Sequence, residues 1–136
     1  MIALLVLTIS FAALLQFFVS YCRSVIAACT GLELSEQVRE ISGIESRRVR
    51  SDEFARLLQL LRLCPEPGND QFGIGAVHGY YGLLGLLRAM VQPLAPALAS
   101  WAEFERQGCA YFAAVALDRR IAYSRDLLAQ QVASRL

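Results

Sequence analysis

The residue types best suited to chemistry in this sequence are a single histidine, His78, and four cysteines, Cys22, Cys29, Cys64 and Cys109. A cysteine can act as a nucleophile with a neighbouring histidine as its base, so His78 with Cys64 or Cys109 is a candidate catalytic pair. None of these residues has the short spacing of a zinc site or a redox dithiol, and His78 lies in an apolar segment. We therefore expect His78 to be a core residue and no cofactor to be bound. A small membrane-bound enzyme or cofactor carrier that uses His78 with a cysteine is the alternative.

A second candidate group is the basic stretch that contains Arg47, Arg48 and Arg50. Guanidinium groups bind phosphate, and each arginine close to an anionic bilayer contributes about 1 kcal/mol to attachment. Acidic residues flank this stretch on both sides, so a solvated loop is the simpler interpretation and lipid-headgroup contact is the alternative. The net charge of the chain is only +1, and we expect no nucleic-acid partner.

The first part of the chain has the composition of a membrane span. Residues 1–22 carry no charge, and eighteen of them are apolar. A helix of this length extends about 33 Å, which is enough to cross a hydrocarbon core of about 30 Å. Residues 1–29 are therefore predicted to form a single transmembrane anchor that contacts the membrane through residues 1–22. Positive charge begins at Arg23, after the span, so the positive-inside rule predicts a single-pass cell-membrane protein whose C-terminal domain is cytoplasmic.

Two forms of N-terminal processing compete with an uncleaved anchor. A secretory signal peptide would need positive charge before a shorter apolar core, and this segment has neither. Residues 26–29, Ile-Ala-Ala-Cys, have the form of a bacterial lipobox, whose cysteine is lipidated after cleavage. Arg23 lies between the apolar run and Cys29, where such signals rarely carry charge. The anchor is therefore the preferred prediction, and a lipoprotein processed at Cys29 is the alternative.

Residues 30–136 are predicted to form a helical domain, so the fold class is all-α: one transmembrane helix followed by a small bundle of about four helices. Apolar periodicity, capping residues and prolines place the four helices at about 31–43, 51–64, 70–92 and 97–133. No segment shows the alternation typical of a β-strand. Ser100 and Glu103 have the spacing of a capping box and are predicted to open the last helix.

The predicted helix at 51–64 has an apolar stripe formed by Leu57, Leu58 and Leu61. We expect this stripe to pack against the long last helix around Phe112 and Val115. Branched side chains on one face, with polar residues on the other, are typical of a buried interface between helices. The stripe is therefore predicted to be core rather than a partner site.

The long last helix is predicted to have an apolar face and a charged face. The apolar face consists of Trp101, Phe104, Gly108, Tyr111, Phe112 and Val115. The charged face consists of Glu105, Arg106, Asp118, Arg119, Arg120, Arg125 and Asp126. Its charges alternate in sign, which is typical of a solvent-facing surface. Glu103 is likewise expected at the surface.

The segment from residue 71 to residue 87 is uncharged and rich in glycine. Gly75 and Gly79 form a small-xxx-small pattern, and together with Gly82 they are predicted to let a neighbouring helix approach closely. Seventeen residues are short for a membrane span, and Arg88 ends the run. A tightly packed core helix is the preferred interpretation, and a re-entrant or second membrane segment is the alternative.

The composition indicates that a large apolar surface must be covered by something outside the domain. Apolar residues make up 56% of the 136 residues, charged residues make up 18%, and the mean hydropathy is +0.43. A soluble domain is usually more polar than this. With no complete catalytic motif in the sequence, we expect an accessory or adaptor subunit that is anchored in the membrane and binds a protein partner.

Overall fold

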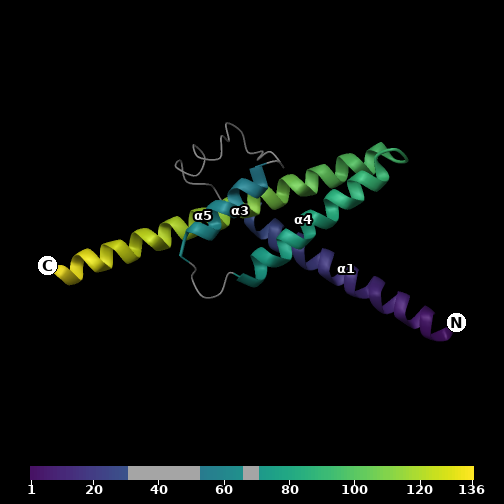
Figure 1. Ribbon diagram of the computed structural model, residues 1–136, viewed down its shortest axis with the longest axis horizontal. Helices are drawn as coiled ribbons and strands as arrows, with labels where there is room; N and C mark the ends of the chain where they lie inside the picture. Colours follow the sequence, from purple (N-terminus) through teal and green to yellow (C-terminus); the bar gives the residue numbers. More distant parts are fainter. Residues whose placement is uncertain (31–52, 66–70) are drawn as a thin grey trace.

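The computed structural model describes residues 1–30, 53–65 and 71–136, and within these ranges the secondary structure is helical (Figure 1). Four helices are present there: α1 Ile2–Thr30, α3 Glu53–Leu63, α4 Gln71–Val91 and α5 Pro96–Arg135. The predicted all-α fold with a long apolar N-terminal helix is confirmed. The predicted helix at 31–43 and the side chains of Arg47, Arg48 and Arg50 lie outside the described residues.

The frame of the molecule is an antiparallel hairpin formed by α4 and α5, which a tight turn at residues 92–95 connects. α3 packs on α5, and the second half of α1 packs on both α5 and α4 (Figure 1). Three helical ends project from this crossing. The first half of α1 and the tip of the α4–α5 hairpin leave on one side, and the C-terminal part of α5 leaves on the other.

α5 begins earlier than the capping-box pattern predicts. Pro96 is its first residue, and Ala95 precedes it in an extended conformation without a side-chain cap. Proline suits the first helical position because its φ is already helical and its missing N–H would have no partner there. Ser100 lies one turn inside the helix and donates to the Pro96 carbonyl, while Glu103 pairs with arginines. The predicted capping box at Ser100 is therefore wrong, although the predicted range of 97–133 lies within α5.

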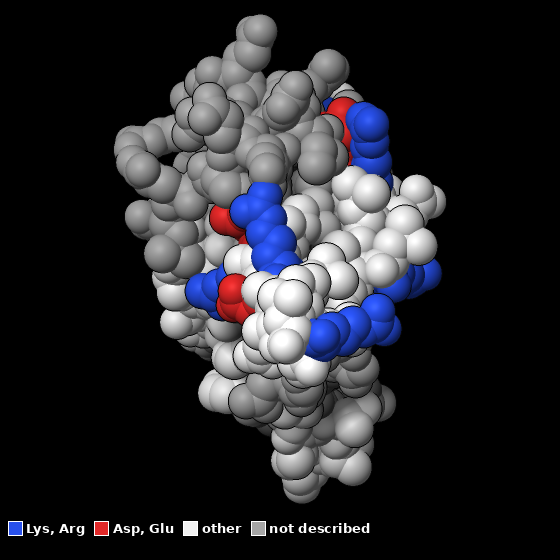
Figure 2. All heavy atoms as spheres, turned by 90° about the vertical axis from the view of Figure 1, so that its left-hand side faces the viewer, with Lys and Arg blue, Asp and Glu red and all other residues white. Residues whose placement is uncertain are grey.

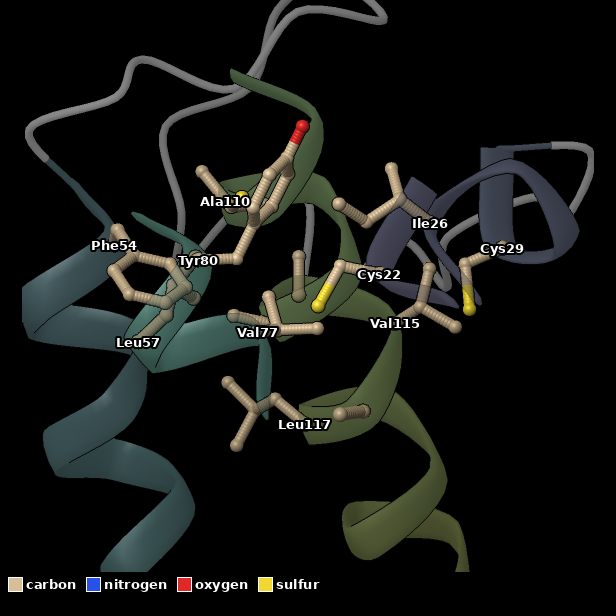
Figure 3. Packing of buried hydrophobic residues seen from close by; sticks show 14 of the residues in the cluster. Cys22, Ile26, Cys29, Phe54, Leu57, Val77, Tyr80, Ala110, Val115 and Leu117 are labelled. Atoms are coloured by element: carbon tan, nitrogen blue, oxygen red, sulfur yellow. The ribbon is translucent and has the colours of Figure 1, made fainter. Parts of the chain in front are cut away.

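The core lies where the four helices cross (Figure 3). Its buried hydrophobic residues are Cys22, Ile26, Cys29, Phe54, Leu57, Leu61, Val77, Tyr80, Leu84, Ala102, Cys109, Ala110, Ala113, Ala114, Val115, Ala116 and Leu117. The part of α5 that lies in the core is rich in alanine, and short side chains allow the neighbouring helices to approach its backbone. The predicted burial of the leucine stripe is confirmed for Leu57 and Leu61, and Leu58 is half-buried at the edge of the core.

The last turns of α1 belong to this core. The thiol of Cys22 donates to the carbonyl of Ala76 in α4 at 3.6 Å, and both Cys22 and Ile26 are buried. Ile26 lies against Gly108 of α5, where an added Cβ would come within 3.0 Å of the Ile26 Cγ2 atom. A larger residue at Gly108 would therefore force α1 away from α5. The structure divides α1 into an exposed first half and a second half, from Phe18 onward, that packs on α4 and α5.

The two faces predicted for the long last helix do not hold along its 40 residues. Trp101 and Phe104, predicted to be apolar packing residues, are exposed near the start of α5. Arg120, predicted to face solvent, is buried, and its Nη1 donates to the Leu61 carbonyl at 2.6 Å. That carbonyl lies in the last turn of α3, where free carbonyls and the negative end of the helix dipole favour a cation. The two predictions were wrong because the helices that neighbour α5 change along its length.

Two helices of the described part are long and apolar enough to cross a membrane, judged by length and composition. In α1 the stretch Ile2–Cys29 has a mean hydropathy of 2.5, and in α4 the stretch Gly73–Val91 has a mean hydropathy of 1.2. One face of α4 enters the core through Val77, Tyr80 and Leu84. α4 therefore contributes one face to the core while most of its remaining surface is open, so a core helix and a second membrane segment both stay predictions for this helix.

Candidate functional site: the charged junction of α1, α4 and α5

Five charged residues from three helices are paired where α1 meets the α4–α5 hairpin, and we call this cluster the charged junction: Arg23, Arg88, Glu103, Glu105 and Arg106. Three of them, Arg23, Arg88 and Glu103, border a segment without charge. Arg23 follows the uncharged run of α1, and Arg88 and Glu103 enclose the uncharged segment that forms the hairpin tip. Toward the hairpin tip, and toward the N-terminus of α1, the chain beyond the junction therefore carries no charged side chain.

The pair of Arg23 and Glu105 joins α1 to α5. The Nε atom of Arg23 lies 3.6 Å from the Oε1 atom of Glu105, and the Tyr80 hydroxyl donates to Oε2 of the same carboxylate at 3.1 Å. The Tyr80 ring packs edge-on against Phe18 of α1, with 6.4 Å between the ring centroids. The Glu105 carboxylate thus has one partner in α1 and one in α4, and it ties both helices to α5.

The pairs around Glu103 join the two helices of the hairpin. Its carboxylate accepts a hydrogen bond from Arg88 of α4 and lies 3.5 Å from Nη1 of Arg106, one turn further along α5. The Nη2 atom of Arg106 donates to the Tyr81 hydroxyl at 2.7 Å, and the Arg106 guanidinium lies 4.4 Å from the Tyr81 ring centroid. Tyr81 in turn stacks on Phe54 of α3 at 4.1 Å between centroids. The chain of contacts extends from the hairpin to α3.

The chemistry of the charged junction is that of neutralised ion pairs. Glu105 accepts a hydrogen bond from Tyr80 and forms an ion pair with Arg23, and Glu103 accepts one from Arg88 and forms an ion pair with Arg106, so both carboxylates are held in place as acceptors. Partly buried pairs of this kind are weakened less by salt than exposed ones. The junction is therefore suited to fixing the angle between α1 and the hairpin.

The described contacts of His78 include no cysteine, and the pairing of His78 with a cysteine stays a prediction. His78 is exposed, contrary to the expectation of a core residue, and its ring lies 6.2 Å from that of Phe54. The shallow hollow beside it is lined by residues of α3, α4 and α5, with no cysteine among them: Leu58, Leu61, Arg62, Ile74, Gly75, His78 and Arg120. Within the described residues, no three or more His, Cys, Asp and Glu side chains are grouped closely enough to hold a metal ion.

The four cysteines differ in accessibility, although all are free thiols. Cys22, Cys29 and Cys109 are buried, and Cys64 is half-buried at the end of α3. Burial raises the pKa of the Cys109 thiol to about 12, and the Glu105 carboxylate close by adds to the rise. The thiolate is the reactive form, so a raised pKa makes Cys109 a poor nucleophile at neutral pH.

We expect alkylation of the native chain by iodoacetamide at about pH 8 to modify Cys64 and to leave Cys109 unmodified, because about one in ten thousand Cys109 thiols is ionised at that pH. Intact-mass measurement should show one added group in the native protein and four after denaturation. Rapid labelling of Cys109 in the native state would contradict its burial. Cleavage before Cys29 with a lipid on its thiol would also remove Cys22, leave two thiols for labelling after denaturation, and support the lipoprotein alternative.

The three glycines predicted to support helix packing have different surroundings. A Cβ added at Gly79 would lie 3.7 Å from the Phe18 ring of α1, an ordinary contact. A Cβ at Gly75 or Gly82 would meet nothing within 4 Å. Close packing at Gly75 and Gly82 stays a prediction that would need a neighbour outside this chain. The tightest approach at a described glycine is at Gly108 of α5, which the sequence analysis placed on the apolar face of the last helix but did not predict as a close helix contact.

The sequence analysis also missed the charged junction. Glu103, Glu105 and Arg106 were expected at the solvent-facing surface, and the structure places them between helices. One signal in the sequence could have revealed them: the interval between Arg88 and Glu103 has no charge, so its two ends are natural partners across a hairpin. That inference requires knowing that the chain reverses direction between them.

Comparisons with protein families, with curated proteins and with solved structures found no match to this chain.

Proposed function

We propose that this protein is a membrane-anchored accessory subunit, in which α1 holds the chain in the cell membrane and the C-terminal part of α5 binds a partner protein on the cytoplasmic side. The residues from Leu128 to Leu136 of α5, which we call the C-terminal arm, carry the proposal. Every residue of the arm is exposed, and the helix continues through it to Arg135.

The C-terminal arm has an apolar stripe without a covering element among the described residues. Leu128 and Val132 are 61% and 60% exposed, and they lie one turn apart on the same face, followed by Leu136. A helix of this length is marginally stable in water on its own, and an amphipathic helix gains stability by placing its apolar face in a groove. The stripe therefore fits a hydrophobic groove on a partner protein.

The charges around this end of the molecule suit a contact with a protein rather than with lipid. Seen from the end at which α5 projects, arginine side chains are spread over uncharged surface and acidic side chains lie beside some of them (Figure 2). A mixed pattern can select a partner with complementary charges, whereas an anionic bilayer would favour a uniformly basic face.

The anchor part of the proposal rests on the composition and exposure of α1. None of the first seventeen residues is buried or half-buried, and the run is uncharged. Cleavage at Cys29, as in a lipoprotein, would remove Cys22 and Ile26 from the core and uncover Gly108. An uncleaved α1 is therefore the form that keeps the core complete.

The experiment compares two matched double variants of the full chain in native membranes treated with a short chemical cross-linker. Leu128→Asp with Val132→Asp changes the apolar stripe, and Gln130→Asp with Ser134→Asp places the same charges one turn apart on the opposite face. We expect the unchanged chain and the control to form the same cross-linked product, and the stripe variant to lose it.

The proposal of a partner site on the C-terminal arm would be wrong if the stripe variant kept the product of the unchanged chain. It would also be wrong if both double variants lost the product equally, because added charge alone would then explain the loss. Circular dichroism of the three purified chains shows whether their helical content is the same.

A further inference from the structure

The tip of the α4–α5 hairpin has a large exposed apolar surface that the accessory function does not use. We call residues 89–102 the hairpin tip; no charged residue occurs between Arg88 and Glu103. The exposed large apolar residues on and beside the tip are Leu86, Leu87, Met90, Leu94, Leu98, Trp101 and Phe104. Leu94, in the turn itself, is 85% exposed. A contiguous exposed patch of this kind usually marks a membrane or protein contact.

The hairpin tip and the exposed half of α1 project toward the same end of the molecule. Phe18 of α1 packs on Tyr80 of α4. Cys22, one turn further along α1, donates a hydrogen bond to Ala76, which lies one turn before Tyr80 in α4. α1 and α4 are therefore antiparallel where they touch. The N-terminal half of α1 and the C-terminal end of α4, which leads into the hairpin tip, therefore point the same way. Figure 1 shows the N-terminus of α1 and the hairpin tip on one side of the core.

The charged junction contains the charges that border the uncharged parts of both structures. Arg23, the first charge after the span of α1, lies 3.6 Å from Glu105 of α5. Glu103, two residues closer to the tip, pairs with Arg88 across the hairpin. Beyond the junction toward the tip, neither α1 nor the hairpin carries a charged side chain. A membrane surface that passes through the charged junction would therefore have the uncharged tip and the exposed half of α1 on the same side.

The length of the hairpin tip suits shallow insertion. Seven residues separate Glu103 from Pro96, which corresponds to about 10 Å of helix. Interfacial helices bury their apolar face by about 5–10 Å at the boundary of headgroups and acyl chains. Trp101 lies near the polar end of the tip, which is the depth at which tryptophan is enriched in membrane proteins.

We propose that the hairpin tip inserts into the lipid bilayer that α1 crosses, in the leaflet from which α1 emerges at Arg23. The inference rests on the anchoring role of α1 in the proposed function and does not depend on the partner of the C-terminal arm. The occupant is lipid because the exposed apolar residues of the tip lie on the same side of the core as the exposed, uncharged half of α1, and the charged junction lies between both of them and the rest of the molecule. The hairpin then fixes the angle of the helical domain against the membrane through the charged junction.

The test uses Trp101, the only tryptophan of the chain, as a natural probe. The full chain is reconstituted into vesicles of phosphatidylcholine and phosphatidylglycerol whose acyl chains carry bromine, either near the headgroup or near the bilayer centre. We expect strong quenching of Trp101 fluorescence by the shallow bromines, weaker quenching by the deep bromines, and little quenching by iodide in the water. A control chain, Trp101→Phe with Leu128→Trp, carries the probe on the C-terminal arm and should show strong iodide quenching and no quenching by bromine.

Three results would overturn the inference. Trp101 quenched by iodide and not by bromine would place the hairpin tip in water. Trp101 protected from both quenchers would mean that protein covers the tip, and a second copy of the chain would then be its occupant. If bromine quenched Trp101 and the tryptophan of the control chain to the same extent, the protein would be adsorbed to the vesicle surface without a defined orientation.

A separate measurement on the same samples distinguishes failure of the anchor from failure of the inference. Vesicles are washed with carbonate and sedimented, and the protein that remains with them is quantified. Retained protein with an unquenched Trp101 leaves the anchor intact and rejects hairpin insertion. If the wash releases the protein, α1 is not a membrane anchor, and the insertion of the hairpin tip beside it is rejected as well.

Discussion

Replacing Leu57 with alanine should lower the free energy of unfolding of the helical core by about 2–5 kcal/mol. Leu57 is 1% exposed and belongs to the α3 side of the core that packs on α5. The shorter side chain leaves a cavity that the surrounding helices fill only in part. Because a domain has a total stability of about 5–15 kcal/mol, the loss is a large share of it. Thermal unfolding of the full chain in detergent micelles, followed by circular dichroism, measures the effect.

The matched control is Leu63→Ala, which makes the same chemical change on the same helix. Leu63 is 82% exposed, so its truncation should change the stability by no more than about 0.5 kcal/mol. If Leu57→Ala and Leu63→Ala lowered the free energy of unfolding by similar amounts, the conclusion that only one face of α3 lies in the core would be wrong. Similar losses would instead indicate that the whole of α3 responds to a loss of apolar surface.

Two arginines in the exposed half of α1, introduced as Ile9→Arg with Ala13→Arg, should prevent stable insertion of the chain into a membrane. Each arginine near the centre of a span opposes insertion by about 2.5–3.5 kcal/mol, so the pair opposes it by about 5–7 kcal/mol. Both positions are exposed and precede the part of α1 that packs in the core, so the helical core should stay folded. The measurement is the fraction of full-length protein that resists carbonate extraction from cell membranes.

The control for this variant changes the same two positions to leucine, which keeps the segment apolar. Ile9→Leu with Ala13→Leu should stay in the carbonate-resistant fraction, as the unchanged chain does. The double arginine variant is expected in the soluble or carbonate-extractable fraction, because the hairpin tip is too short to span the bilayer. Unchanged retention of the double arginine variant would show that the exposed half of α1 is not the anchor.

The helices were predictable because their signals are local. Uncharged apolar residues over a sufficient length define α1, the spacing of Leu57 and Leu61 defines the buried face of α3, and prolines mark the turn before α5. Each of these signals depends on residues within a few turns of one another. The predicted start at about residue 97 lies one residue from the observed start at Pro96, but the capping box at Ser100 does not form, because the proline closer to the turn occupies the first helical position.

The charged junction could not be predicted from the same local signals. Glu105 interacts with Arg23 and Tyr80, which are distant in sequence and belong to two other helices. Viewed alone, α5 shows alternating charges that suit water, and only the contacts of its neighbours convert some of them into partly buried pairs. The same reason accounts for Arg120, which is buried because the end of α3 lies above it.

By itself, the sequence determined that the chain is helical, that it begins with a helix able to cross a membrane, and that it has more apolar surface than one small domain can bury. These properties follow from composition and from the period of the apolar residues, which act within each helix. The tertiary structure alone decided which side of α1 packs on α5 through Gly108, which charges are paired, and that the uncharged hairpin tip points the same way as α1. These properties depend on the angles at which helices cross, and the angles result from side-chain packing between residues that are far apart in the chain.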